Sequence, residues 1–406
     1  MLIDTIRQCL VVPDLKRERL ISQIQSALHN STHCAFKSIE VLAGTLMSMH
    51  WAFGGLSRMM TLSLHADLKA AAGTRYLCLS ETSIQDLQFW LVGFDHYNGI
   101  NPIWRPSGFD LTIFSDAAGR NLQNMGGWGG WTRTAAGIIK IAKGTWDESI
   151  SNTHSTFQEL QAIYNNVLSF NRSKELVGKR ILIKTDNQAV FFIINKSGSR
   201  VPMVHAVCKL FLWYCIHNNI YARATWIPRD MNEFADFYSK FSESSDWKLN
   251  PAVFRDLQRR FRVTFDIDLF ASHENTQTTN YFSFFCTTSC QGVDAFNYVW
   301  GRACWCNPPF NLIARVIAHG IACQAKMCLI CPFTPSAAWW HAVTTSDGRH
   351  FAPFVQEFVF LGRSNTLFLD GRKHYTYSSY PPRWQTFALL VDFASAWSQI
   401  PVPEKP

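Results

Sequence analysis

The chain has 406 residues, of which 47% are hydrophobic and 17% charged, and its formal net charge is +8. This composition excludes an intrinsically disordered chain, and at roughly 100–200 residues per domain the length predicts two to four domains. No apolar run approaches the ~20 residues that span a bilayer. The basic excess is compatible with a phosphate-bearing partner, and equally with an ordinary basic surface.

Cysteine usage indicates the compartment. The chain has 12 cysteines, and its start, MLIDTIRQCLVVPD, lacks the basic and apolar regions of a secretory signal. We therefore expect a reduced, intracellular protein of the cytoplasm and/or nucleus. Seven cysteines lie between Cys286 and Cys331, but only Cys328 and Cys331 form a CxxC pair. A zinc site would need a second closely spaced pair, with His319 as a further candidate ligand, so the favoured interpretation is cysteine as a small buried apolar residue.

The first third, residues 1–105, is predicted to be helical. Apolar residues at helical spacing predict helices over 14–30, 38–53 and 80–94. The second helix is expected to stop at Gly54, and Ser83 and Asp86 have the spacing of a capping box. This region carries no carboxylate cluster or phosphate loop, which predicts a packing or nucleic-acid-tracking module without chemistry.

The middle third, residues 106–245, changes character. An apolar strand containing FDLTIFSD is followed by a glycine-rich meander, and RILIKT and YARATW read as two further strands. Helical patterns lie between and after them. The predicted order is β-β-β-α-β-α-α-β-α, a mixed sheet with flanking helices.

The last third follows SESSDWKLNP, which we interpret as a linker. Strands are expected within FRVTFDIDLFAS, ACWC, KMCLICPF, EFVFLG and FALLVDF, with helical segments between them. This alternation predicts another α/β domain over residues 255–396. The fold class is therefore a multidomain α/β protein.

Four carboxylates of the middle third are candidate site residues. Asp116 is expected to end the first strand and Asp186 the fourth, while Glu159 and Asp236 fall on helices. Ends of neighbouring strands can converge at one sheet edge, and crowded carboxylates are costly unless a cation neutralises them. Mg²⁺ prefers oxygen ligands, and two such ions ~3.5–4 Å apart suit phosphodiester hydrolysis. Taken singly, each residue is more readily a surface acid or a cap, and it is the joint pattern that favours a site.

The motifs SDAAGR, GGWGGW, QEL, TDN and N-x-x-A-D occur in this order over about residues 106–245. Together they resemble the ribonuclease H domain of retroelement reverse transcriptases. The resemblance implies an RNA–DNA hybrid substrate, Mg²⁺ or Mn²⁺ as cofactor, and catalytic, metal-binding roles for Asp116, Glu159, Asp186 and Asp236. It also implies that Asn187 and Asn232 shape the site and the substrate groove.

With this resemblance, the helices before residue 106 look like the thumb or connection region of a reverse transcriptase. The polymerase palm would carry a Tyr-x-Asp-Asp motif, which the sequence lacks. We expect the palm to be missing from this chain, which then resembles the C-terminal part of a longer polyprotein or a truncated copy of such an element.

A second motif, formed by Asn307, Pro308, Pro309 and Phe310, follows an apolar strand. It resembles the catalytic motif of amino-group DNA methyltransferases, in which amide and carbonyl oxygens accept the hydrogens of an exocyclic amine and the aromatic ring stacks on a flipped base. The resemblance implies S-adenosylmethionine as a further cofactor and DNA as a further partner. We expect a pocket behind the motif that opens toward Asp266 and Asp268. The alternative is an ordinary Pro-Pro turn in an inactive relic of the fold.

The surrounding segments DLFASHEN, WCNPPF, FLGR and FALLVDF resemble phage-type adenine-N6 methyltransferases. A ribonuclease H domain followed by such a domain resembles DIRS-type tyrosine-recombinase retrotransposons, and this order covers nearly the whole chain. We therefore expect a Rossmann-like third domain, and hydrolysis of the RNA strand of hybrids as the main activity. Two alternatives stay open: DNA adenine methylation as the main activity, and a decayed copy that only binds nucleic acid.

Overall fold

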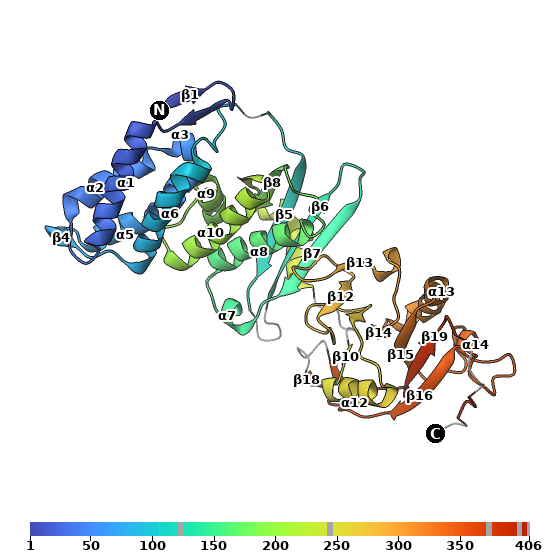
Figure 1. Ribbon diagram of the computed structural model, residues 1–406. Coiled ribbons are helices and arrows are strands. Elements are labelled where there is room, and N and C mark those ends of the chain that lie inside the picture. The colour runs from blue at the N-terminus through green and yellow to red at the C-terminus, as the bar shows by residue number, and fades with distance from the viewer. Residues whose placement is uncertain (105, 121–125, 242–246, 371–375, 396–399, 404–406) are drawn as a thin grey trace. The chain divides into compact units, whose positions relative to one another are not determined.

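The computed structural model describes residues 1–104, 106–120, 126–241, 247–370, 376–395 and 400–403 (Figure 1). Its residues form two compact units, one made of Met1–Ser115, His154–Tyr164 and Lys174–Asn232 and the other of Asp116–Thr153, Asn165–Ser173 and Glu233–Pro406. The division between the two sets of residues falls within strand β5 (Leu111–Ala118). Within the described residues, no helix is long and apolar enough to cross a membrane.

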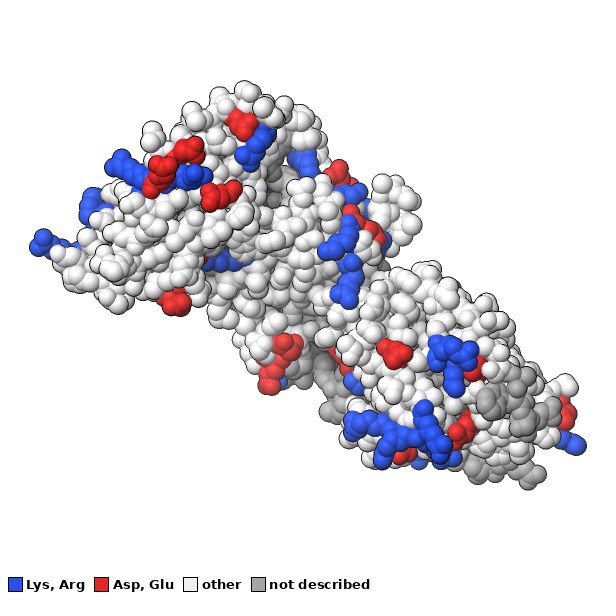
Figure 2. Space-filling view, viewed as in Figure 1, with Lys and Arg blue, Asp and Glu red and all other residues white. Residues whose placement is uncertain are grey.

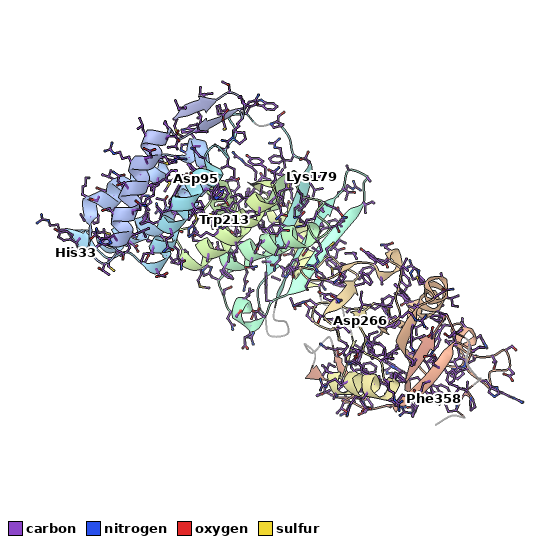
Figure 3. All side chains as sticks on the ribbon, in the orientation of Figure 1. His33, Asp95, Lys179, Trp213, Asp266 and Phe358 are labelled. Atoms are coloured by element: carbon purple, nitrogen blue, oxygen red, sulfur yellow. The ribbon has the colours of Figure 1, made fainter. Side chains whose placement is uncertain are left out.

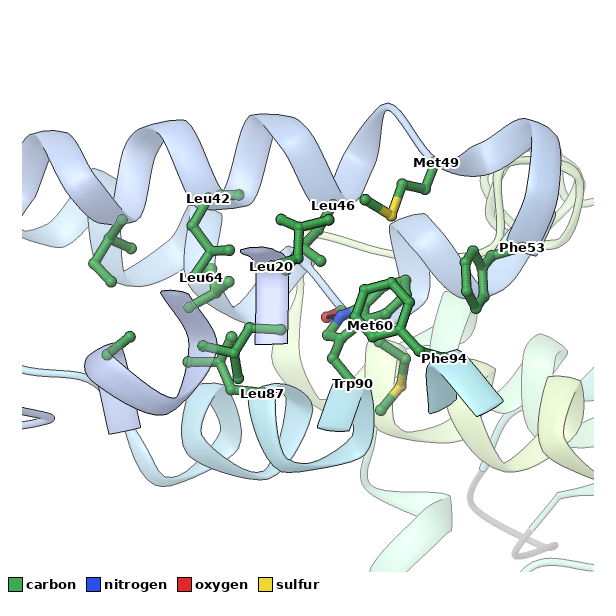
Figure 4. Packing of buried hydrophobic residues seen from close by; sticks show 14 of the residues in the cluster. Leu20, Leu42, Leu46, Met49, Phe53, Met60, Leu64, Leu87, Trp90 and Phe94 are labelled. Carbon is green, nitrogen blue, oxygen red and sulfur yellow. Dashed lines mark hydrogen bonds between the residues drawn. The ribbon is translucent and has the colours of Figure 1, made fainter. Parts of the chain in front are cut away.

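The N-terminal region is helical, as predicted. It contains α1 (Asp14–His29), α2 (Phe36–Met47), α3 (His50–Phe53), α4 (Gly55–Met59), α5 (Leu62–Ala70) and α6 (Glu81–Tyr97), with the short strand pairs β1 (Leu2–Asp4)–β2 (Cys9–Val11) and β3 (Cys34–Ala35)–β4 (Tyr76–Leu77). These helices share one apolar core, in which Trp90 is fully buried and donates its indole N–H to the Met60 carbonyl at 2.9 Å (Figure 4).

Two details of this region differ from the sequence prediction. The predicted helix over 38–53 is broken after Met47, and Gly54 ends the short α3 with a φ of +55°. The predicted capping pair was wrong, because Ser80 is the N-cap of α6 and accepts the backbone N–H of Ser83. Asp86 is instead 1% exposed and binds Lys209 and Ser63. A buried carboxylate needs such partners, which outweighs its capping propensity.

Lys209 belongs to α10 (Pro202–His217), so its ion pair with Asp86 joins α10 to helix α6. Beside it, the ring of Trp213, labelled in Figure 3, packs edge-on against Phe89 at 5.3 Å. His205 contributes a further link, because its Nε2 lies 3.0 Å from the Met59 carbonyl. The N-terminal helices and α10 therefore share both apolar and polar contacts.

The middle of the chain forms a five-stranded sheet in the order β7-β6-β5-β8-β9. β5, β8 and β9 run parallel, and β6 and β7 form an antiparallel hairpin. The element order predicted from the sequence is confirmed, with one additional short helix, α7. The elements after β5 are β6 (Gly127–Arg133), β7 (Ile139–Thr145), α7 (Glu148–Ser151), α8 (Ser155–Phe170), β8 (Arg180–Thr185), α9 (Gln188–Lys196), α10, β9 (Tyr221–Trp226), the 3₁₀ turn η1 (Arg229–Asn232) and α11 (Glu233–Lys240).

The glycines of β6 explain how α11 reaches this sheet. A Cβ on Gly129 would stand 2.3 Å from the backbone nitrogen of Ser239 in α11. A Cβ on Gly130, which faces the other side of the strand, would stand 2.5 Å from the side chain of Asn166 in α8. Only glycine allows this approach on both faces. The GGWGGW motif therefore brings α11 into backbone contact with β6.

The C-terminal region contains a seven-stranded sheet in the order β13-β12-β11-β14-β15-β19-β16. All its strands are parallel except β19, which runs antiparallel to β15 and β16. Helix α12 shares an apolar cluster with one face of the sheet, and α13 shares another with the opposite face. A mixed sheet with helices on both faces agrees with the predicted Rossmann-like class. Its elements are α12 (Pro251–Phe261), β11 (Ile267–Asp268), β12 (Asn280–Ser283), β13 (Gly292–Val293), η2 (Ala295–Asn297), β14 (Cys304–Cys306), η3 (Phe310–Leu312), α13 (Ile313–Cys323), β15 (Lys326–Pro332), α14 (Trp340–Val343), β16 (Val355–Gly362) and β19 (Thr386–Asp392).

Two predictions for this region need correction. The predicted linker is partly a strand, because β10 (Trp247–Leu249) pairs with β17 (Phe368–Asp370), which pairs with β18 (Thr376–Tyr377); residues 242–246 lie outside the described residues. The strand predicted within residues 261–272 comprises only the two residues of β11. Phe261 instead ends α12, where burial of its ring with Leu257 and Phe254 prevails over β propensity.

The cysteines of β14 and β15 lie in the core of this sheet. Burial raises the pKa of Cys304 to about 11 and holds the pKa values of Cys306 and Cys328 well above the ordinary range. Among the described residues, the cysteines take part in no group with metal-binding geometry. These thiols act as small apolar side chains, the interpretation that the sequence favoured.

Candidate functional site

Three of the four predicted carboxylates come together in the five-stranded sheet. Asp116, Glu159 and Asp186 each offer one oxygen, and these oxygens all lie within 4.8 Å of one another. Asp116 is 4% exposed, Glu159 is 8% exposed and Asp186 is half-buried. Among the residues that the structure describes, this is the one group of three or more His, Cys, Asp or Glu side chains with metal-binding geometry.

The two neighbouring parallel strands explain the position of the aspartates. Asp186 directly follows β8, as predicted. Asp116 was expected to end β5 but lies two residues before its end, because the strand continues to Ala118. The Ala118 carbonyl accepts the indole N–H of Trp146 at 3.0 Å. Glu159 lies in the first half of α8. The sheet edge therefore receives one carboxylate from each of three elements.

The fourth carboxylate, Asp236, stands outside this group. Both of its carboxylate oxygens lie 2.6 Å from Nζ of Lys240, one turn further along α11. A place for Asp236 in the same cluster stays a prediction. An i,i+4 pair of this kind contributes only ~0.3–0.5 kcal/mol, and the Lys240 side chain is 52% exposed.

A serine that the sequence analysis did not single out touches the cluster. Ser239 Oγ lies 2.6 Å from Asp116 Oδ2, and both residues are 4% exposed. Ser239 stands three residues after Asp236, a spacing that puts both side chains on one face of α11. That spacing is the signal by which Ser239 could have been found.

The two predicted asparagines have structural partners. Asn187 is the N-cap of α9, and its Oδ1 accepts the backbone N–H of Val190 at 3.1 Å. Asn232 is 1% exposed, and its Nδ2 donates to the Ser115 carbonyl at 3.0 Å, next to Asp116. Asn232 therefore shapes the site from within, and contact of either asparagine with substrate stays a prediction.

The acidic group fits a hard divalent cation. Three carboxylates crowded within 4.8 Å repel one another, and Mg²⁺ or Mn²⁺ relieves this repulsion through the oxygen ligands that these ions prefer. Asp116, Glu159 and Asp186 are the residues that would hold such an ion.

The second candidate site lies at the carboxyl end of β14 in the seven-stranded sheet. From β11 the chain proceeds to β12 and β13 on one side, and then returns to β14 and β15 on the other. The strand order thus reverses between β11 and β14, and α/β sheets bind ligands at such a switch point, outside the carboxyl ends of the strands. Asn307 directly follows β14, so the Asn-Pro-Pro-Phe motif borders this point.

Neighbouring aromatic residues hold the motif. Asn307 Nδ2 donates to the Trp247 carbonyl at 3.1 Å, which leaves its amide oxygen on the opposite side of the amide group. Phe310 is 41% exposed and meets Trp384 edge-on at 4.9 Å. Between Asn307 and Phe310 in the chain lie the buried Pro308 and the exposed Pro309. The motif therefore presents an amide and an accessible ring.

The two acidic residues expected near this motif differ in position. Asp268 ends β11 and is 2% exposed, but its carboxylate already accepts the backbone N–H groups of Phe270 and Gln277, at 3.3 and 3.0 Å. It therefore orders the loop after β11. Asp266, labelled in Figure 3, precedes β11 and lies at the amino end of that strand, whereas Asn307 follows the carboxyl end of β14. Asp266 and Asn307 therefore lie at opposite ends of the paired strands β11 and β14, and the expected pocket stays a prediction.

Positive charge gathers over α12 in the same region (Figure 2). Exposed arginines there include Arg255, Arg259 and Arg260. Arg259 pairs with Asp256 at 3.1 Å and Arg260 with Glu357 at 3.4 Å, which reduces the local excess. This surface is compatible with a phosphate-bearing partner.

Comparisons with known proteins give one family model that matches part of the chain and several similar solved structures. Residues 239–370 match the family model of DNA N-6-adenine-methyltransferase (Dam). No curated protein matches the chain.

Among solved structures, the ribonuclease H1 of the archaeon Halobacterium salinarum is similar, with 17% identity, a TM-score of 0.27, and coverage of 32% of this chain and 93% of that one. The N-terminal ribonuclease H domain of Rv2228c from Mycobacterium tuberculosis has 13% identity, a TM-score of 0.26 and coverage of 32% and 95%. LC11-RNase H1, solved with an RNA/DNA hybrid, has 14% identity, a TM-score of 0.27 and coverage of 32% and 92%.

Proposed function

We propose that the chain is a metal-dependent nuclease that hydrolyses the RNA strand of RNA–DNA hybrids. The observation that carries this proposal is the acidic group itself, in which oxygens of Asp116, Glu159 and Asp186 lie within 4.8 Å of one another. The predicted element order of the sheet and the ordered motifs along it support the same activity.

The residues would act as follows. Asp116 and Asp186 hold their carboxylates at the ends of adjacent strands, and Glu159 adds a third from α8. Mg²⁺ or Mn²⁺ bound there would activate the attacking water and stabilise the charge on the leaving 3′-oxygen. Buried Asn232 holds the chain before α11 against β5, which keeps the geometry of the site constant. Recognition of the hybrid would rest on its backbone and on the 2′-hydroxyl groups.

We further propose that this activity belongs to a DIRS-type retrotransposon reverse transcriptase. The support is the order of parts: a helical region, a sheet with an acidic group, and a region that matches a DNA adenine methyltransferase model. The polymerase palm would then be encoded elsewhere in the element, and the site of action would be the cytoplasm and/or nucleus.

Cleavage of an end-labelled RNA–DNA hybrid tests the proposal. The full chain should cut the RNA strand with Mg²⁺ or Mn²⁺ and stop when EDTA is added. Duplex DNA of the same sequence is the control that should stay intact, because it lacks the 2′-hydroxyl groups. Absence of cleavage with both metal ions would reject the proposal.

A second candidate function is adenine-N6 methylation of DNA, for which the position of Asn307 is the specific observation. Its amide stands at the strand-order reversal of the seven-stranded sheet, inside the matched methyltransferase region. Bound S-adenosylmethionine would supply the methyl group. Asn307 would accept a hydrogen of the target amine, and the exposed Phe310 ring would stack on the flipped base.

The fit of S-adenosylmethionine is only partial. The crevice position suits a ligand, but Asp268 already binds two backbone N–H groups and the loop after β11 contains no glycine. Calorimetric titration with S-adenosylmethionine therefore separates a working methyltransferase from a relic. Heat of binding, together with adenine methylation that is lost in Asn307→Ala, would support the enzyme; absence of both would leave a scaffold.

A further inference from the structure

The last turn of α11 places two side chains on the predicted metal ligands. Ser239 Oγ lies 2.6 Å from Asp116 Oδ2 and 2.9 Å from the Asp236 carbonyl. A hydroxyl has one hydrogen, and the charged carboxylate at the shorter distance is the better acceptor. Ser239 therefore donates to Asp116.

The next residue, Lys240, acts on the other carboxylate. Its Nζ lies 2.6 Å from both oxygens of Asp236, so the ammonium stands where a cation shared by these oxygens would bind. Asp236 is 22% exposed and Lys240 52% exposed. The pair is therefore accessible to an ion from solvent, and a divalent ion must compete with Lys240 for Asp236.

These positions are fixed by the packing of α11 on β6. Gly127 and Gly129 leave space in which the backbone of Ser239 lies directly on the strand, since a Cβ on either would stand within 3 Å of Ser239 backbone atoms. The helix cannot shift toward the sheet, and its last turn is thus held at a set distance from Asp116.

We propose that the last turn of α11 controls metal loading of the acidic group. Ser239 is a positioning residue that fixes the Asp116 carboxylate, and Lys240 is an internal counter-ion that withholds Asp236. The site then takes its first divalent ion on Asp116, Glu159 and Asp186, and engages Asp236 only when an ion displaces Lys240. This inference rests on the proposed metal site.

The two halves of the proposal predict opposite effects. A carboxylate accepts up to about four hydrogen bonds or ligands, so the Ser239 hydroxyl orients Asp116 and still leaves room for a cation. Partners that orient a metal ligand are typically worth ~10–100-fold in metal affinity. Removal of the Ser239 hydroxyl should therefore weaken metal binding, whereas removal of the Lys240 charge should strengthen it.

Calorimetric titration of the full chain with Mn²⁺ alone measures both effects without any substrate. We expect Ser239→Ala to weaken Mn²⁺ binding about 10-fold and Ser239→Thr, which keeps the hydroxyl, to restore it. Ser169→Ala is the matched control: Ser169 is also buried in a helix on this sheet, but it donates to the Asn165 carbonyl and should leave binding unchanged.

For the other half, Lys240→Met should tighten Mn²⁺ binding at least about twofold, whereas Lys240→Arg should not, because it keeps the positive charge. Thermal melts of each variant report whether it folds. Mn²⁺ binding by Ser239→Ala and Lys240→Met that equals the wild type would overturn the inference, and so would a wild type that binds no Mn²⁺. If the wild type binds Mn²⁺ and the variants shift its affinity as expected, but the wild type does not cleave the hybrid, only the proposed function is rejected.

Discussion

The two large sheets place different chemistry at equivalent positions. In the five-stranded sheet, Asp116 and Asp186 lie at or near the carboxyl ends of the adjacent parallel strands β5 and β8. In the seven-stranded sheet, Asp268 and Asn307 lie at the carboxyl ends of the adjacent parallel strands β11 and β14.

The difference lies in how each edge treats charge. The carboxylate of Asp268 accepts backbone N–H groups of its own loop, and the residue at the end of the neighbouring strand, Asn307, is a neutral amide. The three carboxylates of the other edge are left crowded together. The acidic edge therefore fits a cation, whereas the other edge presents an amide and an exposed ring.

The largest expected effect comes from removing charge at the acidic edge. Asp186→Asn keeps the shape of the side chain but loses the charge that holds the metal ion. Hybrid cleavage should fall by more than the ~10–100-fold typical of losing an outer partner of a ligand. Measured with an end-labelled hybrid, near wild-type cleavage by this variant would contradict the metal assignment; an unchanged melting temperature would show that the fold is intact.

The next largest effect is expected where α11 packs on β6, the contact that positions Ser239 beside Asp116. Gly129→Ala places a Cβ 2.3 Å from the Ser239 backbone nitrogen, so α11 must move. We expect a loss of ~1–3 kcal/mol in the free energy of unfolding, measured by urea denaturation. Gly44→Ala is the control: apart from its chain neighbours and the backbone of α2 itself, no atom lies within 4 Å of the added Cβ, and it should stabilise by about 0.5–1 kcal/mol.

A smaller effect concerns pH. Burial lowers the pKa of His205, which is linked to the Met59 carbonyl and to the Ser199 N–H. The unfolded chain then binds a proton near pH 6.5 that the folded chain does not. Stability should fall as the pH drops below about 6.5 and level off below the folded-state pKa. Melts of His205→Gln over pH 5–8 should lack this component, and a variant with the wild-type pH profile would refute the assignment.

The smallest effect distinguishes the core of the seven-stranded sheet from its edge. Burial raises the pKa values of Cys304, Cys306 and Cys328, and their thiolates are scarce at pH 8. In the native chain a thiol reagent should modify the exposed Cys78 first. Mass spectrometry of the labelled peptides measures this order, and early labelling of Cys306 would mean that the β14 edge opens in solution.

The sequence predicted the parts of the site that depend on regular structure. Strand periodicity placed Asp116 and Asp186 at neighbouring strand ends, and parallel pairing of β5 and β8 brings them together. The orientation of the Asp236 side chain could not be predicted from strand periodicity, because Asp236 lies on a helix and forms a weak ion pair with the half-exposed Lys240. The sequence pattern also did not predict how short β11 is. Burial of Phe261 in the apolar cluster of α12 extends the helix into the segment that was predicted to contain a strand.

The most direct test of the account pairs one variant from each edge in two assays. Asp116→Asn should lose cleavage of the RNA–DNA hybrid and keep any binding of S-adenosylmethionine, whereas Asn307→Ala should keep wild-type hybrid cleavage with Mg²⁺. That result would show that the carboxylates of the five-stranded sheet alone carry the nuclease. Loss of hybrid cleavage in Asn307→Ala, or its retention in Asp116→Asn, would contradict the account.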